Sequence, residues 1–199
     1  MARERDEAKR EAILAEAKRL FSERGFHGTS VADIVRSLDL PVGTVYTYFE
    51  NKDAIIRAAI EEGWAQFYDA LESACAAEPS ASARLSLIVD RFLPELFKDV
   101  DLITLFLAEG ARFIDLGSKL ERLAALIAGI IGDLDRETGA RVEMDSRQAA
   151  AALAVFFLGS LDAVRLSRVA DLPLSERDVV DFIRWMIGRT FGLELGAPT

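Results

Sequence analysis

The chain has 199 residues, of which 51% are hydrophobic, and it carries a formal net charge of −9. That length and composition are typical of a folded protein with one or two domains. The single cysteine, Cys75, excludes an intramolecular disulfide, and with the single histidine, His27, it leaves few options for a metal site or a nucleophile–histidine pair. We therefore expect no catalytic residue, no metal and no cofactor.

The acidity is unevenly distributed along the chain. Residues 1–57 hold ten basic and ten acidic side chains, so the net negative charge belongs to the remainder. An acidic protein is a poor general ligand for DNA, but a neutral N-terminal segment can present a basic face if its acids point elsewhere. The sequence contains neither a secretory signal nor an apolar run long enough to span a bilayer, so we expect a cytoplasmic protein without membrane contact.

Apolar residues recur with a helical period and no segment alternates as a strand would, which predicts an all-α fold. The first helix ends at Gly25, because glycine readily adopts the left-handed cap conformation. Ser30 and Asp33 then have the spacing of a capping box, which opens a short helix.

A tight turn follows this short helix, bracketed by Asp39 and Pro41. The next short helix runs from about Val42 to Phe49, and Asn51 caps a long helix over residues 52–76. Two short helices joined by a turn and braced by longer helices are the arrangement of a helix-turn-helix.

The remaining helices are longer and more apolar. We expect them at 82–98 with a kink or break near Pro94, at 101–116, at 118–136, from residue 145 or 146 onward, and from Ser175 to near Gly192, with breaks near Gly117 and Gly139.

The segment 146–166 is apolar on nearly every side, and one chain of this size cannot enclose it. With the apolar stripe over 179–187 it predicts a homodimer in which two helices from each subunit form a four-helix bundle. The alternative is a core helix of a monomer. The predicted dimer interface consists of Val155, Leu158, Leu161, Val179, Phe182, Ile183, Met186 and Ile187.

The segment GFHGTSVADIVRSLDLPVGTVYTYFENKDAII resembles the N-terminal signature of the TetR family of transcriptional regulators, above all in GTVY followed by YF and a lysine. The match covers about 50 residues at fixed spacing. It implies a nine-helix protein with a helix-turn-helix domain over 1–51 and a ligand-binding and dimerisation domain over 52–199, in which 52–76 form a connecting helix. The implied function is a regulator, expected to be a repressor, that binds a palindromic operator of double-stranded DNA as a dimer and is released by a small molecule.

The resemblance also assigns DNA contacts. It implies that Thr44 and Tyr46 contact DNA from the recognition helix, with Gly43 allowing close approach of the backbone. Where the family commonly has polar residues this chain has Pro41 and Val42, and its recognition helix lacks the side chains that read guanine and adenine bidentately. We expect Val42 and Thr47 to read thymine methyl groups or groove shape instead. Phosphate contacts are implied for Tyr48, Lys52, Thr29 and Ser30.

Aromatic residues of the C-terminal part are candidates for an effector cavity, although for most of them a place in the core is the better expectation. Glu109 and Arg112 lie one turn apart and are suited to orient a head group or to form a solvated pair. We expect a small apolar or amphipathic effector. The candidate pocket residues are Trp64, Phe67, Phe92, Phe97, Phe106, Glu109, Arg112, Phe113 and Phe156.

Three other functions compete with this interpretation. An enzyme with an acid/base pair has little support, because the carboxylates form no constellation with a partner and the chain has no glycine-rich phosphate loop. A helical protein-interaction module, or a small-molecule-binding protein without operator activity, is the alternative to a DNA-binding regulator. Steeply salt-dependent binding to a palindromic duplex distinguishes the regulator from both.

Overall fold

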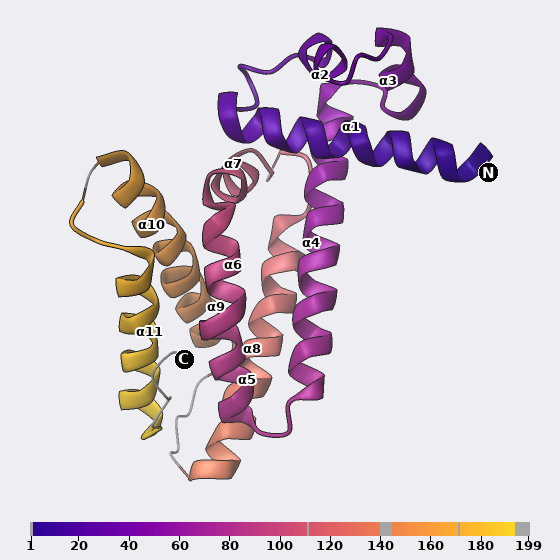
Figure 1. Cartoon of the computed structure of the whole chain (residues 1–199). Helices are drawn as coiled ribbons and strands as arrows, with labels where there is room; N and C mark the ends of the chain where they lie inside the picture. The colour runs from indigo at the N-terminus through magenta and orange to yellow at the C-terminus, as the bar shows by residue number, and fades with distance from the viewer. Residues whose placement is uncertain (1, 111, 140–144, 171, 194–199) are drawn as a thin grey trace. The chain divides into compact units, whose positions relative to one another are not determined.

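The computed structural model describes residues 2–110, 112–139, 145–170 and 172–193, and this part of the chain is helical with no strand. Two of the helices contain a π-helical turn, and counted as continuous elements the described helices number nine (Figure 1). The all-α, nine-helix prediction is confirmed. The elements are α1 (Ala2–Arg24), α2 (Val31–Ser37), α3 (Val42–Tyr48), α4 (Lys52–Ala77), α5 (Ala81–Leu87), η1 (Ile88–Phe92), α6 (Leu93–Lys98), α7 (Val100–Gly110), α8 (Leu116–Thr138), α9 (Ser146–Leu153), η2 (Ala154–Leu158), α10 (Gly159–Ala170) and α11 (Glu176–Phe191).

The chain packs as two compact units. Unit 1 comprises Met1–Gln66 and Asp101–Asp115, and unit 2 comprises Phe67–Val100 and Leu116–Thr199. Helix α4 therefore contributes its first part to unit 1, and α7 packs in unit 1 although it follows α6 in the chain. The functional division into 1–51 and 52–199 stays a prediction, and packing divides the chain differently.

The helix-turn-helix of unit 1 follows the local signals of the sequence. Gly25 ends α1 with φ +73°, and Asp39 takes φ 51° in the turn between α2 and α3. The Ser30 hydroxyl accepts from the Asp33 backbone N–H while the Asp33 carboxylate accepts from the Ser30 backbone N–H, so the expected capping box is formed. The side chain of Asn51 likewise accepts from the Ala54 N–H at 2.8 Å and caps α4.

A single apolar core holds α1, α2, α3 and the start of α4 together, and α7 adds to it. Fully buried side chains from each element meet there, and partly buried side chains of α7 and the turn after it pack against them. Burial of this apolar area holds α1, α2 and α3 in one arrangement. The core includes Ile13, Phe21, Phe26, Ile34, Val45, Phe49, Ile55 and Ile56, with Leu102, Leu105, Phe106, Phe113 and Ile114 packed against it.

In unit 2 the helix over residues 81–98 does not break at Pro94 but widens just before it. The Leu93 N–H bonds to the carbonyl of Ile88, five residues back, which is the π-helical pattern of η1. Pro94 has no N–H for the carbonyl of Asp90, and its ring would collide with that carbonyl in a regular α-helix. The π-turn relieves this conflict, so the expected kink appears as a local expansion.

The expected break near Gly117 lies earlier. Helix α7 ends at Gly110, the turn after it is closed by bonds from the N–H groups of Phe113 and Ile114 to the Gly110 carbonyl, and α8 begins at Leu116. Gly117 therefore lies inside the first turn of α8, where glycine is tolerated because the helix is already bounded on that side by the turn. The prediction of a break at this glycine is wrong by about one helical turn.

Helices α10 and α11 run side by side in unit 2 (Figure 1), and α11 also packs against η1, α6 and α8. Helix α11 begins with a second capping box, between Ser175 and Asp178, and ends at Gly192 with φ +66°. Among the described residues no helix is both long and apolar enough to cross a bilayer.

Candidate nucleic-acid interface

Helix α3 presents one face to solvent. Val42 and Tyr46 are 48% and 53% exposed, while Val45 on the opposite side is completely buried in the core of unit 1. Gly43 and Thr47 are exposed on the same side as Val42 and Tyr46, and a Cβ added at Gly43 would meet nothing within 4 Å. The predicted set of Val42, Gly43, Tyr46 and Thr47 therefore forms one exposed surface, with Thr44 half-buried beside it.

This surface carries no charge. The helix has the sequence VGTVYTY, and the only basic residue between Val31 and Tyr48 is Arg36 on α2. Its side chain is 76% exposed and pairs with Asp33 at 3.1 Å. No role was predicted for this arginine, although its position as the sole cation of the two short helices was a readable signal.

The two neighbouring hydroxyls before α2 have different environments. Ser30 is exposed and its side chain caps the helix, whereas Thr29 is only 2% exposed. The Thr29 hydroxyl lies 2.9 Å from the Gly25 carbonyl oxygen and 3.1 Å from that of Leu20, to which it donates. Because this hydroxyl faces the interior, Thr29 holds the end of α1, and we do not carry it into the proposed DNA contacts.

Lys52 also turns inward. Its ammonium group donates to the backbone carbonyls of Phe26 at 2.8 Å and Thr29 at 2.9 Å, and it lies 4.2 Å from the centroid of the Phe26 ring. These contacts differ from the phosphate contact that the resemblance implies for this residue.

Tyr48 at the end of α3 is half-buried, and its hydroxyl donates to the carboxylate of Asp6 on α1 at 2.7 Å. This hydrogen bond to Asp6 raises the pKa of Tyr48. The capping box lowers the pKa of Asp33, because the Ser30 hydroxyl and backbone N–H both donate to its ionised form.

The candidate dimer residues divide by burial within their own subunit. Leu161, Val179 and Ile183 are at most 8% exposed and belong to the core of unit 2. Val155 and Phe182 are 66% and 55% exposed, while Leu158, Met186 and Ile187 are half-buried.

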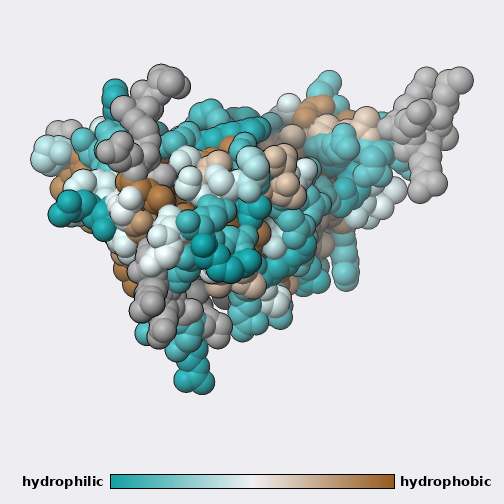
Figure 2. All heavy atoms as spheres, turned by 90° about the horizontal axis from the view of Figure 1, so that it is seen from below, coloured by the Kyte–Doolittle hydropathy of each residue, from teal (hydrophilic) through white to brown (hydrophobic). Residues whose placement is uncertain are grey.

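Trp185, which was not among the predicted interface residues, is 62% exposed and stacks on Phe182 with ring centroids 6.1 Å apart. Its spacing of three residues from Phe182 placed it beside the predicted stripe. On the face shown in Figure 2, hydrophobic residues interrupt the mostly hydrophilic surface in separate patches.

The candidate pocket residues do not form one group. Phe106 and Phe113 pack against the core of unit 1. Glu109 forms an ion pair with Arg112 at 3.2 Å, and its carboxylate lies 3.6 Å from Nε2 of His27. Trp64 is half-buried in unit 1.

The remaining candidates belong to unit 2. Phe67 packs edge-on against Phe92 at 6.1 Å, Phe97 is fully buried, and Phe156 is 40% exposed. Aromatic composition alone did not distinguish these three environments.

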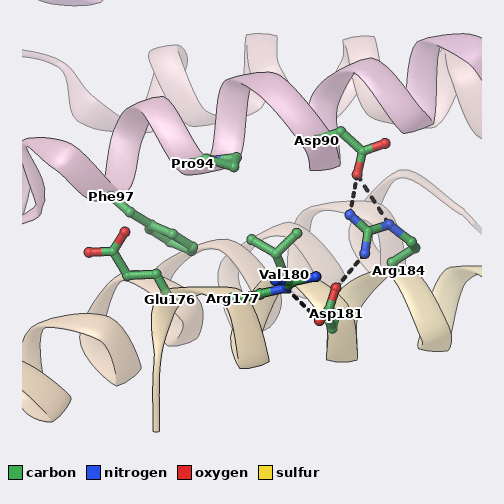
Figure 3. A pocket seen from close by; sticks show the side chains of 8 residues that line it. All are labelled: Asp90, Pro94, Phe97, Glu176, Arg177, Val180, Asp181 and Arg184. Atoms are coloured by element: carbon green, nitrogen blue, oxygen red, sulfur yellow. Dashed lines mark hydrogen bonds and ion pairs between the residues drawn. The ribbon is translucent and has the colours of Figure 1, made fainter. Parts of the chain in front are cut away.

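A groove of about 510 Å³ lies between the η1–α6 segment and α11 in unit 2 (Figure 3). Along one wall the guanidinium of Arg184, 9% exposed as a residue, bonds to the carboxylates of Asp90 and Asp181. These ion pairs raise the pKa of Arg184. Of the candidate pocket residues only Phe97 lines this groove, whose lining is Asp90, Pro94, Phe97, Glu176, Arg177, Val180, Asp181 and Arg184.

The fold and the exposed face of α3 define a helix-turn-helix protein. The sequence profile described as bacterial regulatory proteins, tetR family, matches residues 13–59, which contain α2, α3, most of the core of unit 1 and the start of α4. Over these residues the chain is similar to the TetR family.

The chain is also similar to two curated bacterial regulators. The HTH-type transcriptional regulator UidR of Escherichia coli K12 is 28% identical over 139 residues, which is 68% of each chain. The fatty acid metabolism regulator protein of Bacillus subtilis is 28% identical over 90 residues, 45% of this chain and 46% of that protein, so in this match the chain spans about half the length of its relative.

A solved structure has the same fold over nearly the whole chain. The transcriptional regulator FadR of Bacillus subtilis, in complex with stearoyl-CoA, superposes with a TM-score of 0.64 at 21% identity, covering 92% of this chain and 95% of FadR. At that identity the likeness establishes the fold alone.

Proposed function

We propose that the protein is a ligand-responsive transcriptional repressor that binds a palindromic DNA operator as a homodimer in the cytoplasm. The observation that carries this proposal is the exposed face of α3, with Val42 and Tyr46 turned to solvent and Val45 locked in the core. An exposed tyrosine and valine on a rigidly held short helix serve no packing purpose in unit 1, and they fit the major groove.

The proposed DNA contacts are those whose side chains or backbone are accessible. Tyr46, Thr44 and Gly43 approach the backbone and bases, Val42 and Thr47 meet thymine methyl groups, and Ser30 lies at the phosphate side of α2. Arg36 joins this set as an exposed cation. Because no charged side chain lies on α3, we expect modest discrimination between bases at each half-site.

The proposed dimer forms through α10, α11 and the preceding π-turn. The exposed apolar side chains of Val155, Phe182 and Trp185 lie on these elements, and aromatic residues with large exposed area are the usual anchors of an interface. A dimer also supplies two recognition helices, as a palindromic operator requires.

The proposed effector is a small apolar or amphipathic molecule bound in unit 2, and its binding lowers operator affinity. The FadR structure that superposes on this chain holds stearoyl-CoA, an amphipathic acyl compound, and this supports long-chain acyl thioesters as the first compounds to test. A coupling free energy of about 1–3 kcal/mol is enough for such release.

The test is in vitro selection of a random duplex library on the purified full chain, followed by mobility-shift titration of the enriched duplex. We expect a palindrome, an affinity that falls steeply as salt rises from about 50 to 200 mM, and release by stearoyl-CoA or a related acyl compound. Failure to enrich any duplex, or binding that ignores salt, would refute the repressor and favour a protein-interaction module. Binding of an acyl compound without any operator would instead identify a small-molecule-binding protein.

A further inference from the structure

Three elements of unit 1 converge on Phe26, in the turn between α1 and α2. The centroid of its ring lies 5.6 Å from that of Phe21 on α1 and 5.7 Å from that of Phe113, just after α7. The ammonium of Lys52 lies 4.2 Å from the same centroid. Phe26 is 5% exposed. The turn before α2 is thus held from α1, from α4 and from the segment after α7 at one side chain.

Lys52 closes this turn at the backbone as well. Of the three protons of its ammonium group, two are donated to the carbonyls of Phe26 and Thr29, at 2.8 and 2.9 Å. Bonds from a charged donor are stronger than neutral ones, and the aromatic face adds a favourable cation–π contact. A lysine used in this way has little left to offer a phosphate group.

The turn that Lys52 holds leads directly into α2. Thr29 is the residue before the N-cap Ser30, and its buried hydroxyl bonds back to the end of α1. Gly28 approaches the end of α1 so closely that a Cβ there would lie 2.3 Å from the Arg24 carbonyl oxygen. Because the turn is so tightly packed, a shift of the Lys52 ammonium would move the start of α2 and, through the shared core, α3.

We propose that Lys52 is a positioning residue for DNA binding: its ammonium group clamps the carbonyls of Phe26 and Thr29 and so fixes α2 and α3 on the N-terminus of α4, without contacting phosphate. This inference rests on the proposed function for its DNA readout, but the clamp itself is independent of DNA. Loss of the clamp lowers operator affinity by misplacing the recognition helix.

The two roles of a lysine have different signatures in salt. Each phosphate contact contributes about −0.9 to the slope of log K against log salt, so losing one contact per subunit would make the slope of a dimer shallower by about two. Losing a clamp lowers affinity and leaves the slope unchanged. Loss of the clamp also loosens the turn before α2 when no DNA is present.

The experiment compares Lys52→Met with Arg57→Met. Both variants remove one positive charge from α4, and Arg57 is an exposed residue one to two turns further along the helix. We expect Lys52→Met to bind the selected duplex about tenfold more weakly than Arg57→Met does, with the same salt slope. We also expect faster amide hydrogen exchange over residues 25–30 in Lys52→Met alone.

Lys52→Arg keeps the charge and covers the case in which Lys52→Met does not fold. We expect the planar, longer guanidinium to disturb the bonds to this pair of carbonyls, because its donors lie in a fixed fork, whereas it can replace an ammonium on phosphate. The clamp predicts weaker operator binding and faster exchange over residues 25–30 in Lys52→Arg. Retained affinity and unchanged exchange would overturn the proposal, as would a shallower salt slope for Lys52→Met relative to Arg57→Met.

The failure of the proposed function gives a different result. If the wild-type chain enriches no duplex, hydrogen exchange of the three proteins still decides the clamp. Faster exchange at residues 25–30 only in the Lys52 variants would support the clamp in a protein that is not a repressor. Unchanged exchange would refute the clamp.

Discussion

The hydroxyl of Tyr48 donates a 2.7 Å hydrogen bond to Oδ1 of Asp6, which joins the end of α3 to the first half of α1. The same part of α1 also contacts Phe49, the residue after α3, since Arg10 lies 5.5 Å from the centroid of the Phe49 ring, and Arg10 forms an ion pair with Glu62 of α4. The N-terminal half of α1 therefore contacts the C-terminal end of α3 and the body of α4.

Tyr48→Phe tests whether this tyrosine braces α3 or contacts phosphate. If the hydroxyl serves Asp6, Tyr48→Phe and Asp6→Ala should weaken operator binding to a similar small extent, about two- to threefold, and the double variant should add little more. Mobility-shift titrations of the three variants at two salt concentrations measure this. A Tyr48→Phe variant that binds much more weakly than Asp6→Ala would instead place the hydroxyl on DNA.

The capping boxes predict a dependence of stability on pH. The pKa of Asp33 and that of Asp178 are both lowered by bonds from the Ser side chain and backbone of their own boxes. A depressed carboxyl pKa in the folded state contributes stability that is present above the unfolded value, 3.8, and is lost as pH falls through the folded value. Each box should therefore weaken below about pH 4.

Asp33→Asn and Asp178→Asn separate the two boxes. Thermal unfolding followed between about pH 3 and 6 should show a shallower loss of stability on acidification in each variant than in the wild-type chain. Only Asp33→Asn should also reduce operator affinity at neutral pH, because its box opens α2. Identical acid profiles for wild type and both variants would contradict the capping contribution.

The exposed Phe182–Trp185 stack predicts the site of dimerisation. Trp185→Glu places a charge where two aromatic rings are exposed and stacked, and we expect it to convert the dimer to a monomer at micromolar concentration in sedimentation equilibrium. Leu172→Glu is the matched control, since it makes the same kind of change at a 45% exposed residue outside α10 and α11.

The control should remain a dimer. If both variants dimerise as the wild type does, the interface lies elsewhere; if the wild type is itself a monomer, the proposed dimer is refuted. Operator binding gives a second readout, because a monomer presents a single recognition helix and should lose most of its affinity for a palindrome.

Structural features that depend on a few neighbouring residues could be predicted from the sequence. The box at Ser30, the helix start at Ser175 and the cap at Asn51 are settled within three residues, and glycine at the ends of α1 and α11 is settled by one backbone angle. The faces of α3 were also predictable, because burial of Val45 and exposure of Tyr46 follow from helical spacing.

Contacts between distant segments could not be predicted. Thr29 and Ser30 are adjacent hydroxyls, and only the fold of the end of α1 decides that one is buried and the other caps a helix. Phe113 was a pocket candidate because it is aromatic, yet it packs on Phe26 in unit 1. Chemistry identified these residues as notable, but packing over long sequence separations decided their roles.

The ion pair of Arg184 with Asp90 spans 94 residues and ties α11 to the π-turn before Pro94. The Arg184 side chain is 10% exposed and the Asp90 carboxylate 37% exposed, so the pair is partly screened by water. Asp90→Asn should lower the free energy of unfolding by about 1 kcal/mol, since a charged acceptor of two N–H groups becomes a neutral one while Asp181 still pairs with Arg184.

Asp162→Asn is the control for this prediction. Asp162 is 62% exposed and its pair with Arg165, at 3.4 Å, lies within one helix, so its removal should change stability by less than about 0.5 kcal/mol. Urea unfolding followed by circular dichroism compares the two variants with the wild-type chain. Equal, negligible effects would mean that the Arg184–Asp90 pair contributes nothing beyond a surface ion pair, and that apolar burial alone holds α11 against the η1–α6 segment.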